Sequence, residues 1–261
     1  MDTYRSLDKR DNAQQEELSG GAITPIGTEA LYEHLKRDGD SVRLDMSRLW
    51  ICDADLSGKN LSNIDFSCTR FERTDLRNAF MDNVDVSRCF FVDCKMSGVR
   101  LTNSNASDAS FRGLDLTGAD FSGTDFYYAA LEFSCLDDVI TDENTKWFGD
   151  AVPKKGAFIC WKVGADNRVI QLLVPAEAKR TCATSEAGRA EFAKVLSVTN
   201  ADRTVDYTWA SAMVDHDFIY EVGKIVRPDN GFSEYGWMDD SPGLHFFMDR
   251  GMAVAFGTGN Y

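Results

Sequence analysis

Apolar residues recur at every fifth position through the middle of the chain. Read in windows of five from Leu44, the third place of all 19 windows is apolar, from Met46 to Leu136. The first place is mostly small or aliphatic, the second is most often Asp, and the last two are Ser, Thr, Gly, Asn or charged. This period fits neither a helix nor a plain strand. We therefore expect residues 44–138 to turn a corner after each window and to stack coil upon coil, because one window cannot bury its apolar face alone.

The windows ADLSG (54–58) and ADFSG (119–123) resemble the A(D/N)Lxx units of the pentapeptide-repeat family, and the resemblance covers residues 44–138. It implies a β-solenoid, namely a right-handed quadrilateral parallel β-helix with four windows per coil, about 4.75 coils and a rod about 23 Å long. Residues twenty apart should then lie above one another in four inner ladders. The aromatic ladder should be the best packed, and it consists of Ile51, Phe71, Phe91, Phe111 and Leu131.

Both ends of such a rod expose strand edges that need a cover. Thr28 can cap a helix that ends at Gly39, and Trp147 and Phe148 can act as lids on the last coil. The sequence thus divides into a mobile acidic tail (1–26), an N-terminal capping helix (27–43), the β-helix (44–138), a C-terminal cap and linker (139–156) and an α+β domain of unknown function (157–261).

Beyond Gly156 the sequence changes to longer strand-like runs: AFICWKV, RVIQLLVP, AKVLSV and FIYEVGKIV. Together with a helix expected near residues 185–194, these runs predict a separate small α+β domain. GAFICWKV and SPGLHFFMDRGMAVAF resemble an uncharacterised domain that follows pentapeptide repeats in bacteriophage and other viral proteins. No activity accompanies this resemblance.

Candidate catalytic and metal-binding residues are few. The three histidines His34, His216 and His245 have no metal-site spacing, and the chain contains no GxSxG, Walker or strand-linked GxGxxG motif. Asp215, His216 and Asp217 could hold a metal or a general base, or form a solvated turn. The seven cysteines include no CxxC pair and are interpreted as free, mostly buried thiols. We therefore assign no catalytic residue, metal or cofactor, and keep as an alternative an enzyme in residues 157–261 that uses His245 or Asp215 and His216.

The charge of the chain restricts its partners. A net charge of -14 disfavours direct contact with nucleic acid or anionic membrane and favours a partner with a basic surface. Residues 51–140 hold 15 acidic and 8 basic side chains, hence -7 of that total. No apolar run is long enough to span a bilayer, and the first residues are charged, so we expect a cytoplasmic protein, in the host cytoplasm if it is phage-encoded.

Outward positions of the rod supply the interaction candidates. The Asp that recurs in the second place can be explained in two ways. It is either a solvated residue that fits the backbone of the repeat, or part of an acidic column that attracts cationic partners. Outward aromatic residues mark a contact, either internal or with a partner. The acidic candidates are Asp45, Asp65, Asp85 and Asp125 on one wall, with Asn105 among them, and Asp55, Asp75 and Asp115 on the opposite wall; the aromatic candidates are Trp50 and Phe90 on one wall, Phe80 on its neighbour, and Tyr127, Tyr128 and Phe133 near the last coil.

Some pentapeptide-repeat proteins resemble DNA in shape and charge and act on type II topoisomerases. The leading hypothesis is therefore a non-enzymatic binding module, of phage type, that inhibits a host topoisomerase or defence nuclease. The short rod and the interspersed Arg70, Arg73, Arg100 and Arg112 weaken that analogy. The alternative is a structural adaptor that forms a homo-oligomer and presents the C-terminal domain.

Overall fold

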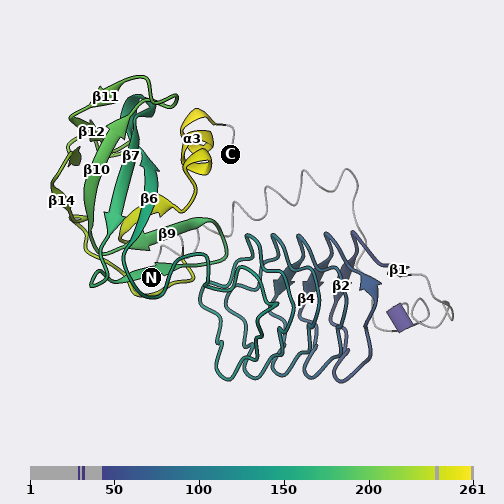
Figure 1. Cartoon of the computed structure of the whole chain (residues 1–261). Helices are drawn as coiled ribbons and strands as arrows, with labels where there is room; N and C mark the ends of the chain where they lie inside the picture. The colour runs from purple at the N-terminus through teal and green to yellow at the C-terminus, as the bar shows by residue number, and fades with distance from the viewer. Residues whose placement is uncertain (1–28, 30, 33–42, 239–240, 260–261) are drawn as a thin grey trace.

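The computed structural model of the chain describes residues 29, 31–32, 43–238 and 241–259. They form a rod of stacked coils that is joined at one end to a unit built on a β-sheet (Figure 1). The tail predicted for residues 1–26 and most of the predicted capping helix lie outside the described residues. Within the described part of the chain, no helix has the length and apolarity needed to span a membrane.

The rod is a parallel coil in which residues twenty apart pair with each other. Leu44 pairs with Ile64 and Trp50 with Arg70, and isolated bridges continue this register as far as Asp120 and Ile140. This confirms the predicted twenty-residue coil. The rod strands are β1 (Leu44–Asp45), β2 (Trp50–Cys52), β3 (Ile64–Asp65), β4 (Arg70–Glu72) and β5 (Phe90–Val92).

Four walls follow from this register, and each is named here after its first outward residue. Their outward second places are Asp45, Asp65, Asp85, Asn105 and Asp125 on the Asp45 wall; Trp50, Arg70, Phe90, Ser110 and Ala130 on the Trp50 wall; Asp55, Asp75, Lys95, Asp115 and Cys135 on the Asp55 wall; and Asn60, Phe80, Arg100, Asp120 and Ile140 on the Asn60 wall.

The corners of the coil have a common backbone conformation. Every fifth place from Arg48 to Asp138 has a positive φ, including non-glycine positions such as Cys68 and Tyr128. The third-place carbonyl accepts a hydrogen bond from the next first-place N–H, as Phe66 does from Thr69 at 3.0 Å. The frequent Gly, Asn and Asp in the fifth place tolerate this left-handed conformation best.

The rod core consists of the predicted ladders. The Phe91 ring stacks on Phe71 and on Phe111 with centroid separations of 5.0 Å in both cases. Met46, Phe66 and the other third-place side chains are buried, except that Leu136 in the last window is only partly buried.

Both ends of the rod core are covered. At the N-terminal end Leu31 is buried in the core, and the Tyr32 hydroxyl donates to the Asp55 carbonyl at 2.6 Å. At the other end Phe148 packs on Phe126 with a centroid separation of 5.2 Å, and Trp237 packs on Phe148 at 4.8 Å. The C-terminal unit therefore contributes directly to closing the solenoid.

The C-terminal unit contains an eight-stranded sheet whose pairs are antiparallel, in the order β11-β10-β7-β6-β15-β9-β8, with β14 also paired to β10. β12 and β13 form a separate two-stranded sheet. The elements are β6 (Phe158–Val163), the 3-10 helix η1 (Ala165–Asn167), β7 (Val169–Val174), β8 (Arg180–Cys182), β9 (Ala187–Ala190), β10 (Ala193–Thr199), β11 (Asp206–Tyr207), β12 (Trp209–Ser211), β13 (Ile219–Glu221), β14 (Ile225–Val226), β15 (Leu244–Phe247) and the helix α3 (Arg250–Thr258).

The helix predicted near residues 185–194 is wrong, because that segment contains β9 and the start of β10. β9 pairs with β15, with Gly188 opposite Phe246. A Cβ on Gly188 would come within 2.7 Å of the Phe246 ring, so the glycine permits a close approach that a helix would not use. Tertiary pairing has overridden a local pattern that favours a helix.

Candidate functional site

The Asp45 wall presents three acidic side chains in register on successive coils. Asp45 pairs with Asp65, and Asp65 with Asp85. Each carboxylate accepts a hydrogen bond at 2.9 Å from the backbone N–H two residues later. The N–H of Ser47 holds the pKa of Asp45 below its usual value. Among the described residues, no ion pair involves these three carboxylates, whereas Asp125 on the same wall lies 3.8 Å from Lys146.

The Asp55 wall is partly neutralised. Asp75 forms an ion pair with Arg77 at 2.5 Å and lies 3.9 Å from Lys95, which takes the acidic place on the next coil. Arg77 holds the pKa of Asp75 below its usual value. Asp55 and Asp115 accept hydrogen bonds from Ser57 and Thr117, in the same way as the Asp45 column.

The arginines that interrupt the acidic surface are matched by carboxylates. Arg70 pairs with Glu72 at 3.0 Å, and Arg112 with Glu132 at 2.9 Å, on the Trp50 wall. The remaining pairs are Arg73 with Asp53 at 2.7 Å and Arg100 with Asp82. The four arginines are therefore neutralised by nearby carboxylates, and these ion pairs do not involve Asp45, Asp65 or Asp85.

The aromatic residues at the outward second places of the rod lie on two walls. Trp50 donates its indole N–H to Glu72 at 3.2 Å, and Phe90 lies on the same wall. Phe80 is 42% exposed and stacks with Arg100. Phe80 lies on the Asn60 wall, which is opposite the Trp50 wall. The prediction of a neighbouring wall is wrong, because the window of Phe80 comes two windows before that of Phe90, which is half of a four-window coil.

The aromatic residues of the last coil make an internal contact. The Tyr127 hydroxyl donates to Glu186 at 2.6 Å, and the Tyr128 N–H donates to the Thr184 carbonyl at 2.9 Å. Phe133 stacks on Tyr235. The C-terminal unit thus contacts these side chains, and Phe133 stays 47% exposed. Sequence reasoning had left this contact open between the chain itself and a partner.

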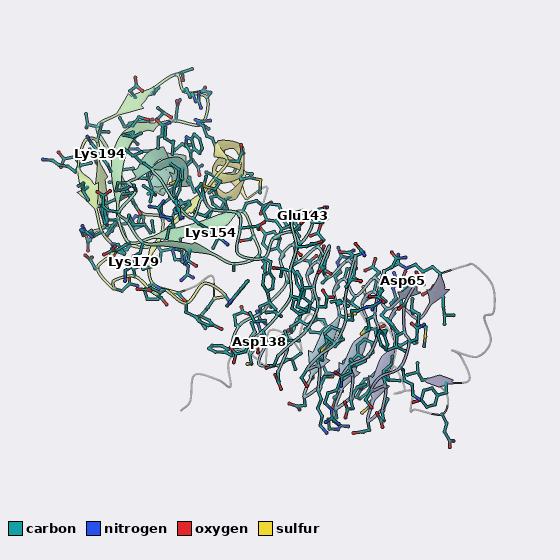
Figure 2. The ribbon with its side chains drawn as sticks, turned by 60° about the horizontal axis from the view of Figure 1, so that its bottom comes forward. Asp65, Asp138, Glu143, Lys154, Lys179 and Lys194 are labelled. Atoms are coloured by element: carbon teal, nitrogen blue, oxygen red, sulfur yellow. The ribbon has the colours of Figure 1, made fainter. Side chains whose placement is uncertain are left out.

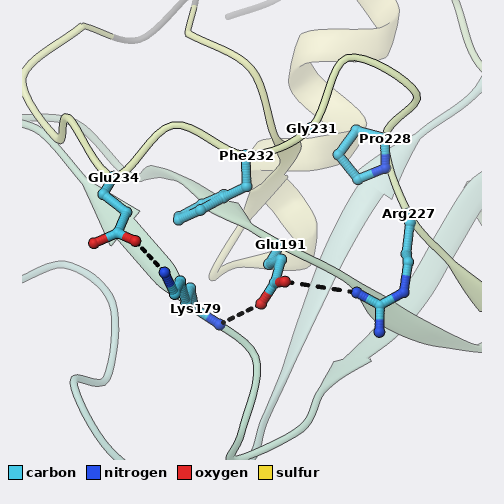
Figure 3. Close-up of a pocket in the computed structure, with 7 residues that line it drawn as sticks. All are labelled: Lys179, Glu191, Arg227, Pro228, Gly231, Phe232 and Glu234. Atoms are coloured by element: carbon cyan, nitrogen blue, oxygen red, sulfur yellow. Dashed lines mark hydrogen bonds and ion pairs between the residues drawn. The ribbon is translucent and has the colours of Figure 1, made fainter.

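A cavity of about 230 Å³ lies beside the edge of the large sheet (Figure 3). Its charged groups pair with one another: Lys179 with Glu234, and Glu191 with Arg227 at 3.7 Å. Glu234 raises the pKa of Lys179. These pairs link the loop that contains Phe232 to the sheet. The charged groups that line the cavity therefore neutralise one another.

A second cavity of similar size is lined by Cys182 and five neighbouring residues. Burial raises the pKa of the Cys182 thiol, so the reactive thiolate is disfavoured there. Neither cavity is lined by His216, which lies in the exposed turn between β12 and β13, or by His245, which lies on β15 opposite Arg189. Within the described residues, no cluster of three or more His, Cys, Asp or Glu could hold a metal ion.

Figure 2 shows acidic side chains such as Asp65 and Asp138 on the rod, and lysines such as Lys154 and Lys194 on the C-terminal unit. The twenty-residue parallel coil, its apolar ladders and its corner at each fifth place define a β-solenoid protein. Residues 64–139 match a family described as a pentapeptide repeat region, so this segment is a pentapeptide-repeat solenoid. Residues 148–253 match a family of unknown function (DUF5758).

Similar solved structures include HetL, a pentapeptide repeat protein from the cyanobacterium Nostoc sp. strain PCC 7120, at 17% identity and TM-score 0.35 over 37% of this chain and 46% of that one. Rfr23 from the cyanobacterium Cyanothece 51142 matches at 24% identity and TM-score 0.33, over 38% and 64%. QnrB1, a plasmid-mediated fluoroquinolone resistance protein, matches at 19% identity and TM-score 0.36, over 40% and 49%. Each match covers less than two thirds of the other chain. No curated protein matches this chain.

Proposed function

We propose that this chain is a non-enzymatic protein-binding module whose Asp45 wall binds the basic, DNA-binding surface of a host protein. The target classes are a type II topoisomerase and a defence nuclease. One observation supports this most: Asp45, Asp65 and Asp85 lie in register on successive coils. Within the described residues, none of the three forms an ion pair. The resemblance of the C-terminal sequence to viral proteins favours a host target.

The geometry of this column suits a cationic surface. Parallel strands place the carboxylates about 4.8 Å apart, so they repel one another and are relieved by an opposing positive charge. The backbone N–H of Ser47, Ser67 or Ser87 already orients each carboxylate. Binding therefore loses little side-chain freedom. The column also depends on the rod's rigid core, which fixes the spacing.

The direct test is inhibition of supercoiling by a type II topoisomerase, and of DNA cleavage by a defence nuclease, at increasing protein concentration. The informative variant replaces Asp45, Asp65 and Asp85 together by Asn. Asn60 and Asn105 already accept the same backbone hydrogen bond at 3.1 Å, so this change removes charge and keeps the corner. We expect inhibition by the natural sequence, and a need for about tenfold or more of the variant to reach it.

The matched control replaces Asp55, Asp75 and Asp115 by Asn, which removes the same three charges from the opposite wall. This control should inhibit like the natural sequence. An enzyme that is unaffected by a large excess of the natural protein is removed as a target. Equal loss of inhibition in both triple variants would contradict a binding role specific to the Asp45 wall and would leave only a general effect of net charge.

A further inference from the structure

The cavity beside Cys182 differs in charge from the cavity beside Phe232. Two of its lining side chains are cationic and none is acidic, whereas the other cavity has two cations and two carboxylates that neutralise one another. Uncompensated positive charge in a cavity of a chain with net charge -14 indicates a preference for anions. The lining residues are Gly149, Val152, Lys154, Arg180, Thr181 and Cys182.

Arg180 contributes a guanidinium group that no carboxylate neutralises. It donates to the backbone carbonyls of Gly156, Pro175, Ala176 and Ala178. These carbonyl oxygens fix the orientation of the group and leave its full positive charge in place, since Arg180 forms no ion pair within the described residues. The cation is therefore oriented before any ligand arrives, as a site for an oxyanion requires.

Lys154 supplies the second cation from the exposed segment that joins the rod to the sheet (Figure 2). In the part of the chain that the structure describes, its ammonium group forms no ion pair. Asp150 is near enough for its charge to act on Cys182, but Asp150 is exposed and does not line the cavity. The sum of these three charges is positive.

Two successive backbone N–H groups converge beside the same cavity. Burial raises the pKa of the Cys182 thiol, and the N–H groups of Val152 and Ala151, which point at its sulfur, act in the opposite direction. Among the described residues neither N–H donates to an oxygen, although Val152 is only 4% exposed. Buried N–H groups almost always have an acceptor, and a thiol sulfur is a weak one. Successive N–H groups of this kind form anion-binding concavities.

We propose that this cavity binds the phosphate group of a small anionic ligand, between Lys154, Arg180 and the N–H groups of Ala151 and Val152. Phosphate suits these donors better than a single carboxylate, because it carries up to two charges and has enough oxygen atoms to accept from the lysine and both N–H groups at once.

The size and place of the cavity define what a ligand does there. A volume of about 230 Å³ is several times the share of one water molecule, about 30 Å³, so part of a phosphorylated metabolite fits beside its phosphate. Val152 and Lys154 precede the sheet in sequence, and Arg180 and Cys182 belong to β8. A bound phosphate therefore links the segment that follows the rod to the sheet.

The test is isothermal titration calorimetry of the full chain with inorganic phosphate and with adenosine 5′-monophosphate, at constant ionic strength and with chloride as the reference anion. We expect saturable binding of one equivalent with a Kd of about 1 mM or below. Tighter binding of the monophosphate identifies a phosphorylated metabolite as the source of the phosphate group. Equal binding identifies free phosphate.

Two neighbouring lysines provide a matched pair of variants. Lys154→Ala should raise the Kd about fivefold to tenfold, because one of the two cations is lost. Lys155→Ala removes the same charge from the next exposed residue, which does not line the cavity, and should change the Kd less than about twofold. Circular dichroism checks that both variants are folded.

The thiol in the cavity gives a second measurement. Phosphate should slow the alkylation of Cys182 by iodoacetamide, followed by peptide mass spectrometry, and should leave unchanged that of Cys135, which is exposed on the rod. The proposal would be overturned by the absence of binding of either compound at about 10 mM. Equal effects of the two alanine substitutions, or alkylation of Cys182 that phosphate does not slow, would overturn it as well.

Discussion

The rings of Phe71 and Phe91 stack 5.0 Å apart with planes inclined by only 11°, although twenty residues separate them in sequence. The contact follows from the twenty-residue coil, which places the two side chains at the same position of successive coils. Stacked rings bury area and gain specific contacts besides.

Phe91→Ala should therefore lower the free energy of unfolding by about 3–5 kcal/mol, because it leaves a cavity between two rings. Phe80→Ala, at an outward place of the same rod, should change it by about 0.5 kcal/mol or less. Urea unfolding followed by circular dichroism measures both. Equal effects of the two substitutions would contradict an inner aromatic ladder.

Two corner glycines allow a comparison at nearly identical backbone angles. Gly98 and Gly118 have φ of +68° and +67° and lie on the same wall. A Cβ on Gly98 would collide with the Asn78 side chain, whereas a Cβ on Gly118 would meet nothing. Gly118→Ala should cost about 1–2 kcal/mol for the left-handed conformation alone.

Gly98→Ala should cost more than Gly118→Ala in the same denaturant experiment. Asn78→Gly, which keeps a residue suited to a positive φ, should remove the excess in the double variant. If both alanine variants unfold alike, the side chain of Asn78 does not occupy the space above Gly98.

The five-residue period predicted the coil, and the four windows per coil that the family resemblance implies gave the inner ladders and the outward columns. Both sets then follow from counting along a regular repeat. Phe71, Phe91 and Phe111 needed no information from elsewhere in the chain. The wall of Phe80 was predicted wrongly although the same count determines it. The period did not predict which outward side chains form ion pairs with one another, such as Arg100 with Asp82.

Phe148 was predicted as a lid on the last coil, but the contacts that the C-terminal unit makes there had no signal in the sequence. Trp237 and Thr184 reach the last coil from positions that no repeat links to it. The segment around Gly188 carries a helical pattern, and only its pairing with β15 makes it a strand. These features are set by tertiary packing, which local patterns do not encode.

The bond between Tyr127 and Glu186 should couple the rod to the C-terminal unit. One oxygen of Glu186 accepts from the tyrosine, and the other is buried and has no hydrogen-bond partner among the described residues. Tyr127→Phe should therefore cost about 1.5–3 kcal/mol, as expected for a hydrogen bond to a charged group. A double-mutant cycle with Glu186→Ala measures the pairwise term, and strictly additive effects would contradict the contact.

We expect the free energy of unfolding to depend on pH because of the buried Lys162. It lies on β6 beside Ile170, and burial lowers its pKa to about 8 from 10.5. Below pH 8 the lysine is charged in both states and the folded state bears the cost of burial. Between about pH 8 and 10.5 only the unfolded state holds the extra proton, so this cost disappears as pH rises.

Lys162→Met should accordingly be more stable than the natural sequence at pH 7, by on the order of 2 kcal/mol. The advantage should shrink towards pH 10. Thermal or urea unfolding of both proteins across this range isolates the lysine, because all other titrating groups are common to both. A difference that stays constant with pH would show that Lys162 keeps its usual pKa.

The most direct measurement of the central claim is competition between this protein and DNA for one enzyme. A fluorescent DNA duplex is bound to the topoisomerase or nuclease that the protein inhibits, and its anisotropy is followed without catalysis. The natural protein and the Asp55 wall triple variant should displace the duplex, and the Asp45, Asp65 and Asp85 triple variant should not. A ternary complex, or equal displacement by all three proteins, would contradict binding of the Asp45 wall to a DNA-binding surface.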